Sequence, residues 1–169
     1  NHRSKIKKIT VLDQKEFKKL HGGEKSTQGV VLKTNDFERP SLQQFLKKEN
    51  VNGKSVLLAL DQITDPQNIG SIMRSCALFN CKGIIVAKDN APDLTPSLYK
   101  AASGAAEIVN YFKVTNLKRS ISELKKHGYW AYGFDSSNDS KSANINFSKK
   151  SILVFGSEGK GIRDLVKKE

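Results

Sequence analysis

The sequence predicts an α/β domain built on a parallel sheet, and its alternating pattern is the main reason. Short apolar runs, typical of buried strands, occupy residues 55–60, 83–87, 109–114, 129–134 and 151–155. Amphipathic stretches separate them, and helix-capping residues such as Thr95-Pro96 and Asn116 open two of these stretches. Strands that alternate with helices pair in parallel through right-handed crossovers. We therefore expect a parallel sheet with helices on its faces.

The charge balance points to a polyanionic partner. The 169 residues include 29 Lys and Arg against 17 Asp and Glu, a formal net charge of +12. This length suits one domain and part of another. A positive excess of this size favours RNA or DNA, which release counterions when their phosphates are neutralised. A merely solubilising surface would have the same composition.

Composition also excludes several classes of protein. No apolar run approaches the ~20 residues of a membrane helix, which excludes a transmembrane protein. Two cysteines and three scattered histidines predict neither a disulfide framework nor a metal site. No signal peptide is recognisable, so a cytoplasmic protein is expected. Because the chain begins at Asn1, a removed targeting segment and the mitochondrial matrix stay open as the alternative.

The first 54 residues differ from the rest of the chain. They are lysine-rich and predict short strands at residues 9–12 and 28–32. Asp13 with Glu16 resembles a capping box that opens a helix, and Pro40-Ser41 opens a second helical pattern. This stretch is too small for a core of its own. We interpret residues 1–34 as the tail of an N-terminal domain, 35–54 as a linker and 55–169 as the main domain.

Residues 65–74 (DPQNIGSIMR) follow the first buried strand and form the first candidate site. Ligands of parallel sheets lie beyond the carboxyl ends of the strands, so this turn is expected at the functional edge. The apolar stripe of the following helix leaves Arg74 on another face, and Asn68 is placed to cap the helix and still face a ligand. An ordinary capped core helix with a solvated arginine has the same pattern.

Residues 155–161 (FGSEGKG) follow another apolar strand. Three glycines allow a sharp bend and a close approach to a ligand. Ile162 stands where a Walker loop requires Lys, and Asp164 stands where a dinucleotide fingerprint requires its last glycine. Glu158 is unusual in a plain turn, although a tight strand-to-helix turn is the alternative.

A third, weaker candidate is the segment Gly133-Phe134-Asp135, which ends the strand predicted at residues 129–134. Asp135 is placed either to contact a ribose or to cap a loop. The aromatic side chains Tyr129, Trp130 and Tyr132 are expected in the core rather than against bases. Cys76, on an apolar helix face, is expected to be a small buried hydrophobe rather than a nucleophile.

Four segments together resemble the SpoU (TrmH) family of RNA ribose methyltransferases: residues 65–75, 100–107 (KAASGAAE), 114–117 (VTNL) and 155–161. Their order and spacing match from about Ser55 to Glu169, most nearly the rRNA guanosine 2′-O-methyltransferases of the bacterial large subunit and their mitochondrial relatives. Residues 27–31 (TQGVV) resemble the family's His-Gln-Gly segment, with Thr27 in place of histidine. Residues 1–34 would then end an RNA-substrate-binding domain.

The resemblance implies a deep C-terminal trefoil knot (the SPOUT fold), a bent S-adenosylmethionine cofactor and a homodimer. It implies that Arg74, Asn68 and Glu158 are catalytic. It also implies cofactor contacts at Gly156, at Gly133 beside the adenosine, and at the adjoining Phe134. The family's third motif, an Ile-Pro-Met-like strand and a Ser-Leu-Asn helix that close the knot, does not occur in these residues, so an incomplete cofactor site is expected.

The expected function is therefore S-adenosylmethionine-dependent 2′-O-methylation of a ribose in rRNA, at a guanosine of the large subunit. The alternatives are a tRNA ribose 2′-O-methyltransferase and a non-catalytic RNA-binding module of the same fold. Because a guanidinium stays protonated, Arg74 is expected to clamp a phosphate and stabilise the developing alkoxide rather than to act as a base. The expected partner is RNA, rRNA before tRNA, with no membrane and no metal.

Overall fold

The computed structural model of the chain describes residues 9–21, 29–31, 38–49, 53–89, 91–134 and 145–169. The chain divides into two compact units, residues 1–37 and 38–169. The first unit contains helix α1 (Gln14–His21). The Asp13 carboxylate accepts hydrogen bonds from the backbone N–H groups of Lys15 and Glu16, each at 2.8 Å. Glu16 in turn accepts from the Asp13 N–H at 3.4 Å, which confirms the predicted capping box.

The short strands expected near the amino terminus are not found in the described residues. Residues 9–12 are not extended into a strand, and the prediction there is wrong. Ile9 and Val11 are 78% and 91% exposed, so the local apolar pattern has no paired strand or core to bury it. Residues 29–31 are also outside any strand, and Gly29 has φ of +79°. Residues 28 and 32, the ends of that second predicted strand, lie outside the described residues.

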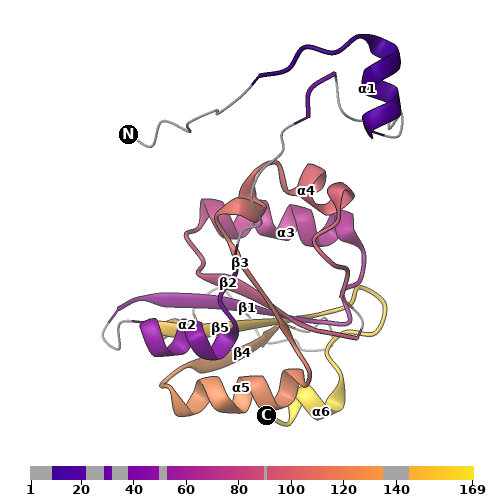
Figure 1. Cartoon of the computed structure of the whole chain (residues 1–169). Coiled ribbons are helices and arrows are strands. Elements are labelled where there is room, and N and C mark those ends of the chain that lie inside the picture. Colours follow the sequence, from indigo (N-terminus) through magenta and orange to yellow (C-terminus); the bar gives the residue numbers. More distant parts are fainter. Residues whose placement is uncertain (1–8, 22–28, 32–37, 50–52, 90, 135–144) are drawn as a thin grey trace. The chain divides into compact units, whose positions relative to one another are not determined.

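The second unit is built on a five-stranded sheet of order β3-β2-β1-β5-β4 (Figure 1). The strands are β1 (Ser55–Asp61), β2 (Gly83–Ala87), β3 (Asn110–Val114), β4 (Trp130–Phe134) and β5 (Lys150–Gly156). Every neighbouring pair is parallel, which confirms the predicted sheet. The predicted strand ends differ from these bounds by one residue at most. The order reverses between β1 and β5, and at such a point the crevice beyond the strands is a common ligand site.

Two layers of helices cover the sheet (Figure 1). One layer contains α3 (Pro66–Leu78), α4 (Pro96–Ala102) and the 3₁₀ helix η1 (Ala105–Glu107). The other contains α2 (Leu42–Lys48), α5 (Leu117–Lys126) and α6 (Asp164–Lys167). Because side chains alternate along a strand, Leu58 and Leu60 pack under the first layer, and Leu57 and Ala59 under the second. No described helix is long and apolar enough to cross a membrane.

Helix α3 lies very close to α4. A Cβ added at Gly70 would lie 2.5 Å from the Cβ of Ala101 and 2.8 Å from its carbonyl carbon, so only glycine allows this approach. Ile69 and Met73 are fully buried on the same face of α3. Cys76 is 1% exposed, and burial raises the pKa of its thiol to about 12, which confirms that it serves as a small hydrophobe.

The aromatic residues of β4 divide between core and surface. Tyr129, just before the strand, is 3% exposed as expected, and Tyr132 is half-buried. Trp130 is 67% exposed, and the prediction that it belongs to the core is wrong. β4 is an edge strand and Trp130 is its first residue, so neighbouring side chains cover only part of the indole.

A buried polar cluster ties α2 to the amino ends of β1 and β5. The Glu49 carboxylate accepts hydrogen bonds from the Tyr129 hydroxyl and, at 3.1 Å, from Lys150 Nζ. The Ser55 and Tyr129 hydroxyl oxygens are 2.7 Å apart. Helix α2, which falls within the expected linker, thus packs against the sheet, with Leu42 and Leu46 buried. The functional division of the chain at residues 34 and 54 stays a prediction.

We expect acid to remove part of the stability that Glu49 provides. Burial raises the pKa of Glu49, but hydrogen bonds from Ser55, Tyr129 and Lys150 outweigh it and hold the pKa below its usual range. The contribution is therefore fully present above the unfolded-state pKa of about 4.3 and is lost as pH falls through the lower folded-state value. Urea unfolding of wild type and Glu49→Gln, compared between about pH 7 and pH 3, measures this. The variant should be about 1–3 kcal/mol less stable than wild type at neutral pH, and this difference in the free energy of unfolding should narrow in acid. A difference that does not depend on pH would contradict the prediction.

Candidate functional site

The carboxyl ends of β1, β5 and β4 bring the candidate segments to one edge of the sheet. In the paired register Asp61 lies opposite Gly156, and Phe134 lies opposite Phe155. The β1–α3 loop (residues 62–65) and the β5–α6 loop (residues 157–163) leave this edge beside each other. This is also the point where the strand order reverses. The structure therefore brings Gly156 and Phe134 together, and Gly133 lies one residue further down β4.

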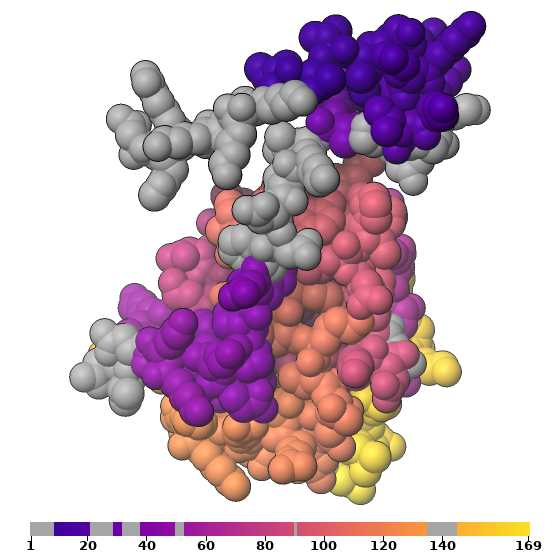
Figure 2. All heavy atoms as spheres, viewed as in Figure 1, coloured from indigo at the N-terminus to yellow at the C-terminus, as the bar shows by residue number. Residues whose placement is uncertain are grey.

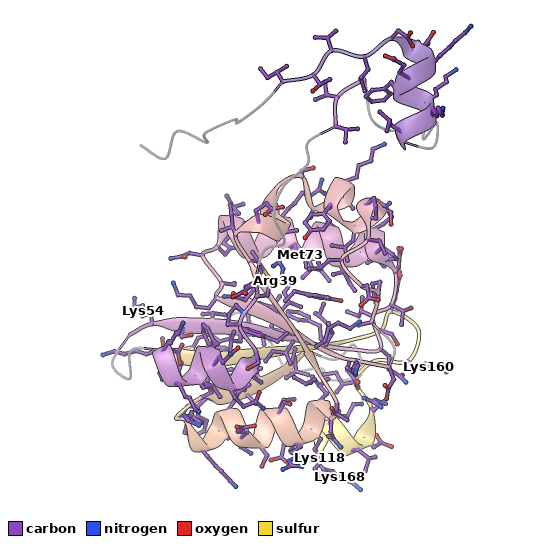
Figure 3. The ribbon with its side chains drawn as sticks, viewed as in Figure 1. Arg39, Lys54, Met73, Lys118, Lys160 and Lys168 are labelled. Atoms are coloured by element: carbon purple, nitrogen blue, oxygen red, sulfur yellow. The ribbon has the colours of Figure 1, made fainter. Side chains whose placement is uncertain are left out.

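The β5–α6 loop folds back on its own strand. Ser157 and Gly161 form an antiparallel bridge, in which the Gly161 N–H donates to the Ser157 carbonyl at 2.8 Å. A Cβ on Gly156 would lie 1.9 Å from the Gly161 carbonyl carbon, so this position requires glycine. The tip of the loop, residues 158–160, is exposed, and Figure 3 shows Lys160 at the outer edge of the molecule, far from buried Met73. Glu158 thus projects into solvent at the turn.

An ion pair that sequence reasoning missed anchors the far end of this loop. Asp61 is 0% exposed, and its carboxylate lies 2.6 Å from Nη2 of Arg163. Nε and the backbone N–H of Arg163 also donate to it, at 2.8 and 2.9 Å. The hydrogen bond to Asp61 raises the pKa of Arg163. The available signal was a single acidic residue at the end of an otherwise apolar strand, SVLLALD.

Two phenylalanines border this edge on the β4 side. The rings of Phe134 and Phe155 are stacked, with centroids 4.9 Å apart and an interplanar angle of 11°. Gly133 is exposed, and a Cβ there would meet only the Ile162 side chain, at 3.4 Å. A cavity of about 710 Å³ reaches Gly133 from the space between α5, β4 and α6. Gly133 therefore offers open backbone on the α5–α6 side of the sheet, whereas the stacked rings lie on the α3 side, where Phe155 packs against the core.

On α3 the structure corrects one expectation. The helix cap is Asp65, whose carboxylate accepts from the Gln67 N–H at 3.0 Å, and not Asn68. Pro66 occupies the first helical position, which fixes the cap one residue before it. Asn68 is exposed in the first turn of the helix. Its side chain is left available for a ligand.

Arg74 is also exposed, and its Nη2 lies 3.4 Å from Ser71 Oγ. It lies six residues beyond Asn68, a rise of about 9 Å along the helix. Among the described residues, no hydrogen bond or ion pair joins Arg74, Asn68 and Glu158. The structure thus places the three expected catalytic residues on two segments that leave the same sheet edge, without direct contact between them.

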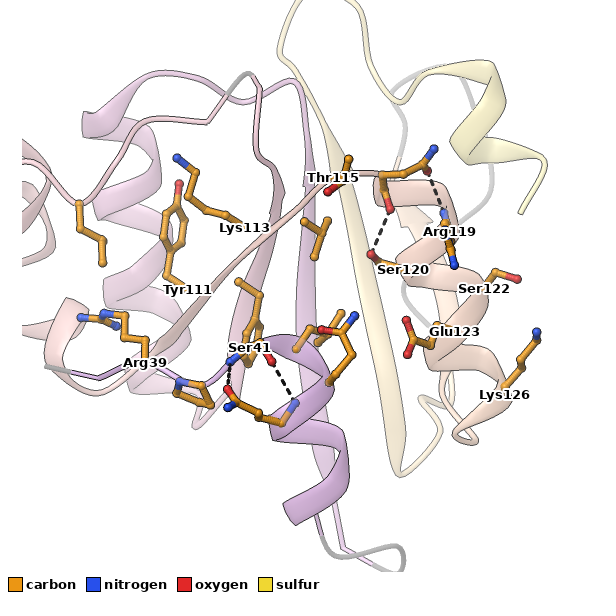
Figure 4. Close-up of a pocket in the computed structure, with 18 of the residues that line it drawn as sticks. Arg39, Ser41, Tyr111, Lys113, Thr115, Arg119, Ser120, Ser122, Glu123 and Lys126 are labelled. Atoms are coloured by element: carbon orange, nitrogen blue, oxygen red, sulfur yellow. Dashed lines mark hydrogen bonds between the residues drawn. The ribbon is translucent and has the colours of Figure 1, made fainter.

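A second concave surface lies on another part of the domain and includes none of the expected site residues. This groove of about 1380 Å³ runs along edge strand β3 between α2 and α5 (Figure 4). Figure 2 shows the side chains of α2 and α5 on the same face of the molecule. Its charged lining residues are Arg39, Lys113, Arg119, Lys126, Asp93 and Glu123. Lys113 pairs with Asp93 at 2.6 Å, and the Arg39 guanidinium donates to the Ala106 carbonyl at 2.6 Å.

In the part of the chain that the structure describes, no group of three or more His, Cys, Asp or Glu residues is arranged to hold a metal ion. Neither cysteine forms a disulfide.

Comparison with known proteins identifies the family of this chain. The family model of the SpoU rRNA methylases matches residues 55–169. Bacillus subtilis YacO, named for the TrmH family of tRNA/rRNA methyltransferases, is 38% identical over 143 residues, which cover 84% of this chain and 57% of YacO. A Staphylococcus aureus (strain MSSA476) relative with a name of the same family is 37% identical over 140 residues, covering 82% of this chain and 56% of its own. The chain thus spans a little over half the length of these curated relatives.

Solved structures share the fold. The AdoMet-bound rRNA methyltransferase from Sinorhizobium meliloti superposes with a TM-score of 0.65 at 21% identity, covering 73% of this chain and 48% of its own. The SpoU methyltransferase AviRb from Streptomyces viridochromogenes, in complex with AdoMet, gives 0.63 at 23% identity over the same shares. At these identities the likeness concerns the fold alone. With the family match and the curated relatives, it confirms the expected α/β class, and the chain belongs to the SpoU rRNA methylase family.

Replacement of Gly156 should have a much larger effect than replacement of Gly159 in the same loop. In Gly156→Ala the new Cβ would overlap the backbone of Gly161, so the loop must move, and we expect a loss of about 2 kcal/mol or more in the free energy of unfolding. In Gly159→Ala the Cβ meets nothing within 4 Å, and the change should stay below about 0.5 kcal/mol. Urea denaturation followed by circular dichroism measures both. Equal losses would show that the close approach at Gly156 does not exist.

Proposed function

We propose that this chain is the methyltransferase domain of an enzyme that transfers the methyl group of S-adenosylmethionine to a ribose 2′-hydroxyl of rRNA, at a guanosine of the large subunit. The observation that supports it best is the convergence of three segments at the reversal point of the sheet. They carry Gly156, Phe134 and Asn68, the residues that the family resemblance assigns to cofactor binding and catalysis. The family membership and the fold support the same activity.

The residues at this edge suit S-adenosylmethionine. Gly156 has no room for a side chain because the Gly161 backbone packs against it, whereas Gly133 exposes backbone that a flat ligand can approach. The half-buried, stacked rings of Phe134 and Phe155 make the α3 side of the sheet apolar at this end. Two solved structures of this fold contain AdoMet. When bound, the cofactor supplies an electrophilic methyl group on a sulfonium.

The reaction that follows is an in-line displacement, in which alignment and loss of the hydroxyl proton are the main demands. Arg74, exposed on α3, is placed to hold an RNA phosphate and to stabilise negative charge that develops on the ribose oxygen. Asn68 and Glu158, both exposed and without direct contact to Arg74, would orient the ribose and the arginine once RNA is bound. A guanidinium remains protonated in proteins, so Arg74 acts through charge and geometry rather than as a base.

We propose RNA as the partner and a homodimer as the working form, as the family resemblance implies. The net charge of +12 favours binding of a polyanion. The groove between α2 and α5 is the surface that we assign to RNA contact. Among the described residues, Arg119 and Lys126 form no ion pair, and both line that groove, so they are available to phosphates.

Two alternatives to rRNA methylation are a tRNA substrate and a non-catalytic RNA-binding module. YacO is named for both tRNA and rRNA methyltransferases, which keeps a tRNA substrate as the second candidate. A non-catalytic RNA-binding module is disfavoured because Arg74, Asn68, Glu158 and Gly156 are all present. A cytoplasmic location, or a mitochondrial one, remains a prediction.

Arg74→Ala should abolish methyl transfer while leaving cofactor affinity nearly unchanged. Purified protein of verified mass is incubated with methyl-labelled S-adenosylmethionine and undermethylated total RNA, and labelled nucleosides are identified after nuclease digestion. We expect label in a 2′-O-methylguanosine of rRNA and a fall of at least about 100-fold in the variant. Lys82→Ala, a lysine at the opposite edge of the sheet, is the control and should keep full turnover. Wild-type turnover in Arg74→Ala, or label on a base, would contradict the mechanism.

RNA affinity should fall steeply with salt, because phosphate contacts release counterions. Filter binding across a salt series gives the slope of log affinity against log salt. Arg119→Ala and Lys126→Ala should each reduce this slope by about one. Lys118 and Lys125 on the same helix pair with Glu169 at 4.0 and 3.9 Å, and their alanine variants should change it less. A flat salt response would remove RNA as the partner, and equal effects of all four would remove the groove as the contact surface.

A further inference from the structure

We propose that Asp61 and Arg163 form a positioning pair that holds the two loops of the site in a fixed relation. This rests on the proposed function in one respect, namely that the β5–α6 loop binds S-adenosylmethionine. Neither residue is one of the expected catalytic or cofactor-binding residues. Their role is to fix where Glu158 and the loop backbone stand relative to α3.

The side chain and the backbone of Arg163 both contact the Asp61 carboxylate. One carboxylate oxygen, Oδ1, accepts a hydrogen bond from Arg163 Nε at 2.8 Å and lies 2.6 Å from Nη2, and the other, Oδ2, accepts from the Arg163 backbone N–H at 2.9 Å. Because both carboxylate oxygens are engaged, one by the guanidinium and one by the backbone N–H, the orientation of the carboxylate as well as its distance is fixed. The backbone contact fixes the main chain of residue 163 itself. The end of the β5–α6 loop is therefore held at the end of β1.

The other end of the same loop is held independently. Gly156 is paired in the sheet opposite Asp61, and the Ser157–Gly161 bridge closes the turn. Between these attachments only residues 158–160 are exposed. The direction of Glu158 is thus determined by the sheet on one side and by the ion pair on the other.

The same carboxylate also marks the start of the β1–α3 loop. Asp61 is followed by Gln62, which has φ of +61°, and then by Asp65, which caps α3. Asn68 and Arg74 follow on that helix. Asp61 is therefore the residue at which the segments that carry Asn68, Arg74 and Glu158 are connected.

A role in stability alone does not account for this arrangement. The Arg163 side chain is 41% exposed, and an ion pair with an exposed partner usually contributes little net stability. Asp61, by contrast, is fully buried at the end of an apolar strand, where a carboxylate is costly unless it is well paired. The pair therefore holds a buried carboxylate to one loop residue through two hydrogen bonds and one further ion-pair contact.

The test combines a readout of loop order with one of cofactor binding. Hydrogen–deuterium exchange followed by mass spectrometry measures the amides of residues 156–163 in the purified chain without any ligand. Isothermal titration calorimetry measures the dissociation constant for S-adenosylmethionine. The variants are Arg163→Ala and Arg163→Lys, which keeps the charge and the backbone contact. Lys113→Ala is the matched control, because its ion pair with Asp93 has the same 2.6 Å separation but lies on β3.

We expect Arg163→Ala to speed exchange at residues 156–163 by about tenfold, with β2 and β3 unchanged, and to weaken cofactor binding by about tenfold, the effect of one charge-assisted hydrogen bond. Arg163→Lys should restore part of the loop protection and part of the cofactor affinity. Ser55→Ala, which removes a buried hydroxyl at the amino end of β1, controls for general destabilisation and should change neither loop exchange nor cofactor affinity.

Unchanged loop exchange in Arg163→Ala would overturn the proposal, as would cofactor affinity that stays normal while the loop loosens. If Arg163→Ala does not fold, the exchange and affinity of Arg163→Lys decide by the same criteria. If the wild-type chain binds no S-adenosylmethionine, as an incomplete cofactor site would make it, loop exchange alone decides whether the pair positions the loop, and the methyl-transfer assay above decides the proposed function.

Discussion

The parallel pairing of β1 with β5 is the contact on which the rest of the domain depends. Residues 55–61 pair in register with residues 150–156, although almost a hundred residues of chain separate them. This pairing joins the β3-β2-β1 half of the sheet to β5 and β4, and so creates the reversal of strand order. Because it sets Asp61 beside Gly156, it also determines that the loops after these strands share one edge.

The two edges of the sheet serve different purposes. At the amino edge, Glu49, Ser55, Tyr129 and Lys150 satisfy one another, and the side chains of Glu49 and Lys150 are 10% and 11% exposed. At the carboxyl edge, Asn68, Arg74 and Glu158 stand exposed. Polar groups that are mutually satisfied fix a structure, whereas those left open are available to a ligand. Among the described residues, the polar groups of the amino edge are thus satisfied by one another, whereas three side chains at the carboxyl edge are left open to a ligand.

Much of the fold was predictable because it depends on local patterns. Apolar runs located every strand to within one residue, and Asn116 caps α5 as its position before Leu117 indicated. The errors arise where tertiary contacts decide. Residues 9–12 have a strand-like pattern without a partner strand, and the exposure of Trp130 depends on β4 being the edge of the sheet. The ion pair of Asp61 with Arg163 joins residues 102 positions apart, which no local pattern reveals.

The close approach of α3 and α4 has a wider consequence for the site. The absent side chain at Gly70 lets the backbone of α4 set how deeply α3 sits on the sheet. Arg74 lies one turn further along that rigid helix, so the height of its guanidinium above the sheet follows from the same contact. The reach of the expected catalytic arginine is therefore governed by α4, a helix that carries none of the candidate site residues. Substitutions in α4 can alter the chemistry of a site that they never touch.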